Sequence, residues 1–161
     1  MIPAVHFDGE TRYLSTPDEV SESLDTVLRP GVGDENHVIA TWLVYNDEKT
    51  QAPVSFLDVC ANLEKGLGGV VWFAGGEEAA RIEKETGSDM GHYFWVSDSG
   101  TLLDPDPEVL SDHYAPSYFD PRGVISIEAI RNAVESFCRS NGKRPSGIGW
   151  VAGNQNGTRF D

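Results

Sequence analysis

The pattern of apolar and polar residues predicts two amphipathic helices. Residues 16–19 supply a Thr N-cap, a Pro in the first helical position and a Glu placed to complete a capping box. Apolar residues then recur at helical spacing up to the Pro-Gly pair at residues 30–31, which predicts a helix over about residues 17–28. The second helix follows Ser126 as its N-cap and ends at the Asn-Gly pair of residues 141–142.

Short runs rich in β-branched and aromatic residues predict strands between these helices. The runs cover residues 37–45, 54–59, 70–73, 92–96 and 148–151, and residues 77–85 predict a short exposed helix. Strands joined by short turns form an antiparallel sheet, and two amphipathic helices can cover only one of its faces. We therefore expect a two-layer α+β fold with a mainly antiparallel β-sheet and two helices packed on one face.

The length of 161 residues suits a single domain. We expect that domain to span residues 1–153 and the polar residues 154–161 to form a flexible C-terminal tail. Cys60 and Cys138 lie in apolar surroundings, which favours buried thiols over a disulfide. No signal peptide and no run long enough to span a membrane is visible, so the sequence predicts a cytoplasmic protein without membrane attachment.

Charge narrows the choice of partners. The chain has 26 Asp and Glu against 12 Lys and Arg, a formal net charge of −14. Nucleic acids and anionic lipid surfaces bind proteins largely through Lys and Arg, so neither is an expected partner. The composition instead favours a basic protein partner, although many proteins are acidic for solubility alone.

Motifs for catalysis, cofactors and metals are missing from the sequence. The four histidines stand apart, and no phosphate-binding glycine loop, dinucleotide motif or Gly-x-Ser-x-Gly elbow occurs. Asp104, Asp106 and Glu108 resemble the start of a calcium loop, but Val109 and Ala115 stand where that loop needs Gly and Glu. We expect no catalytic, cofactor or metal site. A small carboxylate-based hydrolase using His92 or His113 is the alternative from another class.

Residues 104–120 form the strongest candidate for a binding surface, because acids and rigid aromatic rings alternate there without Lys or Arg. Aromatic side chains often carry interface energy, and carboxylates steer a basic partner. The candidates in this loop are Asp104, Asp106, Glu108, Asp112, Tyr114, Tyr118 and Phe119. Asp47 and Glu48, in the turn after the first predicted strand, are further candidates. The opposing interpretation is a solvated loop whose rings tuck under the domain.

The C-terminal third of the chain carries a family pattern: residues 124–129 introduce the second helix, Phe137 lies within it, and residues 141–145 (Asn-Gly-Lys-Arg-Pro) precede Ile-Gly-Trp at 148–150. This pattern resembles the closing motif of the bacterial Immunity protein 1 family of polymorphic-toxin systems. The helix from residue 16, the strand with Trp42 and the Gly-Val-Val run at 69–71 extend the resemblance over most of the chain. The longer middle, about residues 74–123, departs from the family pattern.

The resemblance implies a cytoplasmic immunity protein that binds a cognate toxin and occludes its active site. Toxins encoded beside this family are often nucleic-acid-modifying, deaminases among them, and such enzymes need basic surfaces. A domain of charge −14 is suited to cover a surface of that kind. A general acidic adaptor without a dedicated toxin is a third hypothesis.

Overall fold

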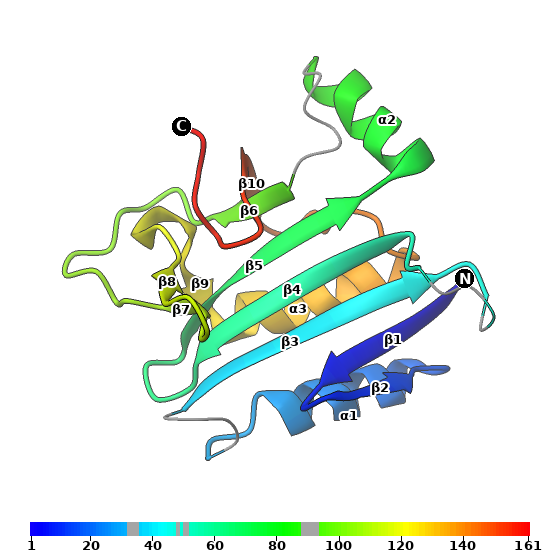
Figure 1. Ribbon diagram of the computed structural model, residues 1–161, viewed down its shortest axis with the longest axis horizontal. Helices are drawn as coiled ribbons and strands as arrows, with labels where there is room; N and C mark the ends of the chain where they lie inside the picture. Colours follow the sequence, from blue (N-terminus) through cyan, green and yellow to red (C-terminus); the bar gives the residue numbers. More distant parts are fainter. Residues whose placement is uncertain (32–35, 48, 50–51, 88–93) are drawn as a thin grey trace.

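Most of the chain forms one antiparallel sheet with two helices behind it (Figure 1). The computed structural model describes residues 1–31, 36–47, 49, 52–87 and 94–161. In this part of the chain the sheet has eight strands in the order β10-β6-β5-β4-β3-β1-β2, with β9 paired to β5. The strands are β1 (Ile2–Phe7), β2 (Glu10–Tyr13), β3 (His37–Tyr45), β4 (Ser55–Asn62), β5 (Leu67–Ala74), β6 (Phe94–Asp98), β9 (Ile125–Ser126) and β10 (Gly149–Gly153). The predicted α+β class is confirmed.

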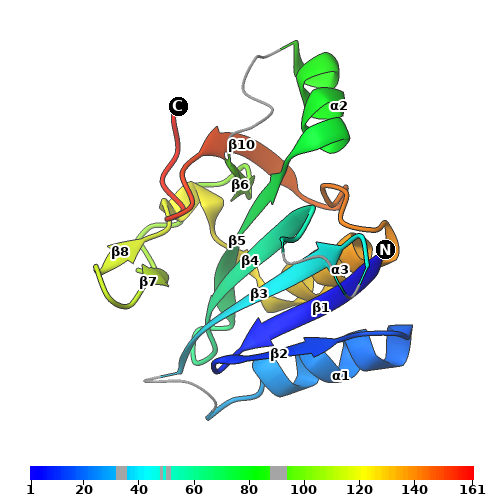
Figure 2. The same ribbon diagram turned by 45° about the vertical axis from the view of Figure 1, so that its right-hand side comes forward.

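The helices are α1 (Pro17–Val27), α2 (Gly76–Thr86) and α3 (Ile127–Arg139), with a 3₁₀ turn, η1, at Pro121–Gly123. Helices α1 and α3 lie on the same side of the sheet, whereas α2 projects beyond the end of β5 (Figure 2). The predicted capping box at α1 is present: Glu19 N donates to Thr16 Oγ1 at 3.2 Å, and Thr16 N donates to Glu19 Oε2 at 3.2 Å. No helix in the described ranges is long and apolar enough to cross a membrane.

The main core lies between the sheet and helices α1 and α3. Every second residue of β3 points into it, as the alternating burial of that strand shows. Trp42, at the centre of β3, is fully buried, and its Nε1 donates to Ser23 Oγ of α1 at 3.1 Å. This hydrogen bond satisfies the indole N–H and fixes the position of α1 against the sheet.

The family-like segment after α3, residues 141–150, makes structural contacts. Gly142 has φ +85°, and its N–H donates to Phe137 O at 2.8 Å, which ends the helix with a left-handed turn. Trp150 Nε1 donates to Pro145 O at 2.8 Å. The Arg144 guanidinium lies 4.7 Å from the ring centroid of Trp95, in cation–π geometry. These contacts tie the chain after α3 to the edge of the sheet.

Three local expectations differ from the structure. Strands β4 and β5 are longer than predicted, because Gly68, Gly69 and the small residues near the β4–β5 turn remain paired. The β1–β2 hairpin was not predicted, although Asp8 and Gly9, both with positive φ, form a typical hairpin turn. The strand predicted from His92 begins at Phe94 in the described ranges, and residues 92–93 lie outside them.

The C-terminal residues form backbone contacts with the edge of the sheet. Residues 154–161 fold back beside β10, where Phe160 N donates to Ala152 O at 3.0 Å and Arg159 forms a bridge with Gly153. Because β10 is an edge strand, this return covers backbone groups that would otherwise be unpaired.

Candidate partner-binding surface

The loop of residues 104–120 lies against the face of the sheet opposite α1 and α3 (Figure 1). It contains a short hairpin of β7 (Leu110–Asp112) and β8 (Ser117–Tyr118). Val109 and Phe119 pack beneath this hairpin in a second, smaller core with Cys60 and Val96. The loop is therefore a packed structure with one side fixed to the sheet and the other facing solvent.

Phe119 belongs to this second core. It is 1% exposed, and its ring lies directly over the backbone of Gly69 and Gly157, where an added Cβ would come within 2.5 Å and 2.7 Å of the ring. A side chain in this position cannot contact a partner without unfolding the loop. For Phe119, the interpretation in which a ring tucks under the domain is the one that fits the structure.

Of the other candidates in the loop, Asp104, Asp106 and Glu108 are exposed and Asp112 is half-buried. Tyr114 is fully exposed at 101%, and Tyr118 is exposed at 46%. Asp106 Oδ1 accepts a hydrogen bond from Glu108 N, and Asp112 Oδ1 accepts one from Tyr114 N, each at 2.8 Å. These bonds order the turns of the loop.

Within the described residues, none of the carboxylates of Asp104, Asp106, Glu108 and Asp112 forms an ion pair. The β7–β8 loop thus presents carboxylates without ion-pair partners beside two exposed rings. On the other side of the loop, Lys65 Nζ donates to Pro107 O at 2.8 Å and holds it against the sheet.

The turn after β3 lies at the other end of the sheet. The rings of His37 and His113 are 6.5 Å apart, so the β7–β8 hairpin is beside the start of β3. Asp47 follows the end of β3, which is about 27 Å away for a strand of this length. The structure does not bring Asp47 together with the loop candidates, and Glu48 lies outside the described residues.

An apolar row on the same face was missed by the sequence argument. Leu43 pairs with Phe56 on β4, Phe56 pairs with Phe73 on β5, and Phe94 of β6 lies beside Phe73. The ring centroids of Phe56 and Phe73 are 5.3 Å apart and those of Phe73 and Phe94 are 5.0 Å apart. We call these four partly exposed residues the apolar band. The alternation of side chains along a strand shows that the sheet has two faces. It does not show which of the two faces the helices leave open.

Asp58 lies one step along the strands from the apolar band. Oδ1 of Asp58 accepts a hydrogen bond from Thr41 Oγ1 at 2.6 Å, and Oδ2 accepts one from Gln155 Nε2 at 3.2 Å. Burial raises the pKa of this carboxyl, and the two hydrogen bonds oppose that rise. Thr41 and Gln155 are both neutral hydrogen-bond donors. In the described part of the chain Asp58 has no ion-pair partner.

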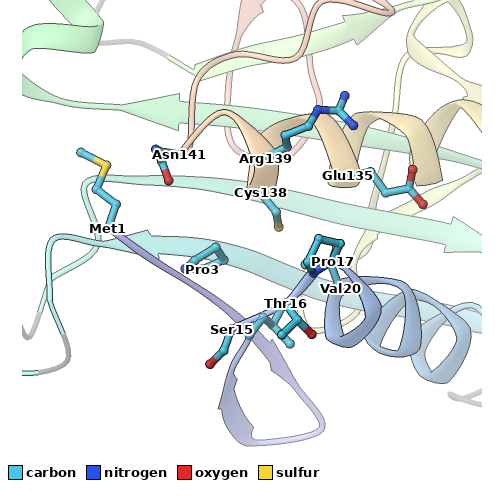
Figure 3. A pocket seen from close by; sticks show the side chains of 11 residues that line it. Met1, Pro3, Ser15, Thr16, Pro17, Val20, Glu135, Cys138, Arg139 and Asn141 are labelled. Atoms are coloured by element: carbon cyan, nitrogen blue, oxygen red, sulfur yellow. The ribbon is translucent and has the colours of Figure 1, made fainter.

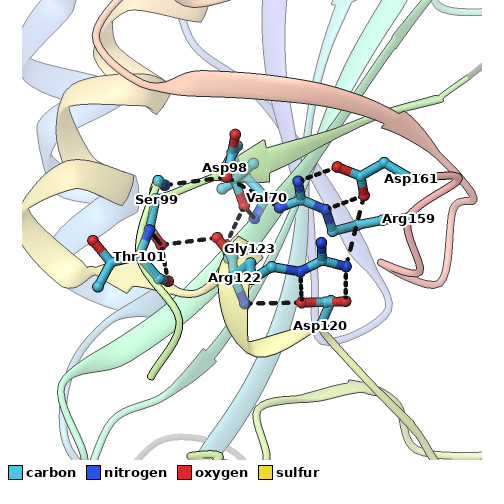
Figure 4. Close-up of polar contacts among 11 residues, drawn as sticks. Val70, Asp98, Ser99, Thr101, Asp120, Arg122, Gly123, Arg159 and Asp161 are labelled. Atoms are coloured by element: carbon cyan, nitrogen blue, oxygen red, sulfur yellow. Dashed lines mark hydrogen bonds and ion pairs between the residues drawn. The ribbon is translucent and has the colours of Figure 1, made fainter. Parts of the chain in front are cut away.

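A cluster of ion pairs holds the C-terminal residues that deliver Gln155 to Asp58 (Figure 4). Arg159 pairs with Asp98 at 3.0 Å and with Asp161 at 2.7 Å, and Arg122 pairs with Asp120 at 2.8 Å. The bond from Arg122 lowers the pKa of Asp120. We call this cluster the C-terminal clasp. Its carboxylates are already neutralised, so it acts as a structural element.

A pocket lies elsewhere, between the start of α1 and the end of α3 (Figure 3). This pocket of about 470 Å³ has Cys138 in its wall, and burial raises the pKa of that thiol to about 12. The thiol is protonated at neutral pH and is a poor nucleophile. The hydroxyl of Thr16, also in the wall, is engaged in the capping box.

The hydrolase alternative relies on His92 or His113. His113 lies on the β7–β8 hairpin beside His37, and His92 is outside the described residues. Among described residues, no group of three or more His, Cys, Asp and Glu side chains is arranged to hold a metal ion.

The described residues thus form an acidic α+β domain with exposed carboxylates, exposed aromatic rings and buried thiols. The family model of Immunity protein Imm1 matches residues 8–152, and the chain belongs to this family. Comparison with curated proteins and with solved structures finds no match. Membership confirms the resemblance noted in the sequence and makes the chain an immunity protein against a toxin, of a family that suggests non-enzymatic inhibition.

Proposed function

We propose that this protein binds one cognate toxin domain in the cytoplasm and occludes a basic active-site surface on it. The family match over residues 8–152 is the observation that carries the proposal. The net charge of −14 supports a basic target, because two surfaces of opposite charge associate faster and more selectively. A nucleic-acid-modifying toxin, such as a deaminase, is a target of this kind, since it needs cationic side chains to hold its substrate.

The exposed part of the β7–β8 loop supplies the first contacts in this proposal. Its carboxylates are Asp104, Asp106, Glu108 and Asp112, and its exposed rings are Tyr114 and Tyr118. Carboxylates without ion-pair partners keep their full charge for a cationic surface, and tyrosines beside them bury area at low entropic cost. Asp47 and Glu48 are more distant candidates for the edge of the interface.

Co-expression with the toxin domain encoded beside this gene tests the function itself. We expect restored growth and a one-to-one complex that survives size-exclusion chromatography. If the toxin domain neither binds the protein nor is neutralised by it, the proposal is wrong. Equal binding to an unrelated basic protein of similar size would favour a general acidic adaptor.

A charge-reversed variant tests the loop. Replacing Asp106, Glu108 and Asp112 with Lys changes the net charge from −14 to −8, because each reversal adds two charges. We expect association to slow by about tenfold or more and its salt dependence to weaken. The matched control reverses Glu22, Glu77 and Glu128, which are exposed on α1, α2 and α3 and, among the described residues, form no ion pair. If both variants lose binding equally, the loop has no special role and only net charge matters.

A further inference from the structure

We propose that the face of the sheet opposite α1 and α3, beside the β7–β8 loop, is the anchoring part of the toxin interface, where the apolar band packs against the toxin and Asp58 receives one of its Lys or Arg side chains. This inference rests on the proposed function and names the part of the surface that holds the partner. The β7–β8 loop packs against the same face, and Phe94 of the apolar band lies against the second core beneath that loop.

The first observation is the position of the apolar band. Helices α1 and α3 cover the other face of the sheet, and α2 lies beyond the end of β5 (Figures 1 and 2). In the described part of the chain no helix covers the band, and its four side chains keep partial exposure in the isolated protein. Three aromatic rings that contact one another on three neighbouring strands make a preorganised apolar surface. Such surfaces on an otherwise acidic protein mark interaction sites.

The band continues toward the β2 edge of the sheet. Ala4 of β1 pairs with Leu43 on one side and with Tyr13 on the other, which extends the row by two strands. Tyr13 is 42% exposed, and its ring lies 6.0 Å from that of Tyr45. Tyrosine rings are frequent anchors of interfaces. The row therefore reaches from β6 to β2, nearly the full width of the sheet.

The second observation is the carboxylate beside this row. Asp58 follows Phe56 by two residues on β4, so both side chains point to the same face. Its oxygens are held by Thr41 and Gln155, which orient the carboxylate without neutralising it. A carboxylate that is partly removed from water and lacks a cation is costly in the free protein. A cationic side chain from a partner would remove that cost on binding.

The charge of the chain decides between possible occupants of this face. A second copy would bring another net charge of −14 and a second Asp58 to the same surface. A basic toxin brings the missing cation to Asp58 and apolar stems of Lys or Arg to the Phe rings. We therefore assign the face to the toxin, and self-association through it is an outcome that the experiment must exclude.

The decisive variant is Asp58→Asn, with Glu22→Gln as its matched control. Both remove one negative charge. Asn keeps one acceptor oxygen, and its NH2 group can donate to the Thr41 hydroxyl or to the Gln155 amide oxygen once that amide turns around. We expect Asp58→Asn to weaken toxin binding by about tenfold or more, mainly through faster dissociation, because a buried charge pair loses one partner. Glu22 is exposed on α1, so Glu22→Gln should change the affinity for the toxin by less than twofold.

A second experiment labels an exposed residue and leaves the buried side chains of the sheet unchanged. Thr11 is exposed on β2 and lies in the same row as Asp58, through His6 and Thr41. A bulky maleimide on Thr11→Cys should block the toxin, whereas the same label on Ser21→Cys of α1 should not. The native thiols are buried, which keeps Cys60 and Cys138 out of the labelling reaction.

The outcomes separate the two proposals. If the toxin is neutralised and bound but Asp58→Asn and the Thr11 label have no effect, the face is not the anchor and the proposed function stands. If no toxin complex forms at all, both proposals fail. A dimer of this protein that Asp58→Asn alters would assign the face to self-association and overturn the inference. Thermal melting of each variant confirms that it is folded.

Discussion

The indole Nε1 of Trp72, in the middle of strand β5, donates a hydrogen bond to the carbonyl oxygen of Gly142 at 3.0 Å. Trp72 is fully buried, so an unmet indole N–H there would be costly. Gly142 belongs to the family-like segment after α3, seventy residues along the chain. This single bond therefore joins the centre of the sheet to the end of the helix that covers it.

Gly142→Ala should strongly destabilise the fold. Gly142 has φ +85°, and an added Cβ would lie 2.0 Å from Ser55 Oγ and 3.1 Å from Val44. Strained backbone and overpacking together should cost about 2–4 kcal/mol of the free energy of unfolding. Gly147→Ala is the control, because nothing lies within 4 Å of its Cβ position. Urea unfolding measures both, and equal stability of the two variants would contradict the structure.

Two substitutions in the β7–β8 loop should have different effects, one on stability and the other on toxin binding. Phe119→Ala opens a cavity between the loop and Gly69, at an expected loss of about 3–5 kcal/mol in the free energy of unfolding. Tyr114→Ala removes a fully exposed ring and should change stability by less than about 0.5 kcal/mol. We expect Tyr114→Ala to weaken toxin binding without lowering the melting temperature. A large stability loss from Tyr114→Ala would show that the loop packs differently.

Asp58→Asn should stabilise the free protein at neutral pH. The folded-state pKa of Asp58 is raised from 3.8 because burial disfavours the charged form. The protonated carboxyl therefore contributes its full stabilisation of the folded protein at pH values below the pKa of the unfolded state. This stabilisation is lost as the pH rises through the pKa of the folded state. Asn keeps the side chain neutral at every pH. The melting temperature of the variant should exceed that of the wild type at pH 7, and the difference should shrink toward pH 4.

The matched comparison is again Glu22→Gln, which makes the same change in net charge on the exposed side of α1. Its melting temperature should stay close to that of the wild type across this pH range. If Asp58→Asn lowers stability at pH 7, the carboxylate is stabilised in the fold and the argument for an incoming cation fails. Greater stability combined with weaker toxin binding would show that Asp58 is kept for function.

The C-terminal clasp should contribute measurably to stability. The Arg159 side chain is 5% exposed, and Arg159→Ala would leave Asp98 without its cation and release residues 154–161 from β10. We expect a loss of about 1–3 kcal/mol in the free energy of unfolding, typical of hydrogen bonds to charged groups. Lys143→Ala, at an exposed position, is the control. Amide hydrogen exchange should also quicken at Phe160 and Asn154, and unchanged exchange would mean that the clasp does not hold the tail.

Local signals in the sequence predicted local structure well. The capping box at Thr16 and Glu19 and the cap at Ser126 each specify a helix start through bonds between residues three apart, so the helices were found with nearly correct ends. The run of β-branched and aromatic residues at 37–45 gave β3 its correct bounds. The family pattern in residues 141–150 was also visible, because its Gly and Trp are needed by the local turn and by packing.

Features that depend on distant partners were not predictable. Phe119 and Tyr118 are adjacent aromatic residues in one acidic loop, and only the packing against Gly69 and Gly157 makes the first a core residue. The tail lacked any apolar or helical pattern, yet Arg159 finds Asp98 sixty-one residues away. The apolar band appeared as ordinary strand residues, since no local pattern shows which face two helices will cover.

By itself, the sequence determined the charge, the helix caps, the β-branched and aromatic strand runs and the family pattern, all of which depend on residue identity and on neighbours a few positions apart. Tertiary structure alone decided that Asp58 meets Thr41 and Gln155, that Phe56, Phe73 and Phe94 form one row, and that Asp47 lies far from the β7–β8 loop. The physical reason is that strand order and register bring together side chains whose separation along the chain carries no periodic signal.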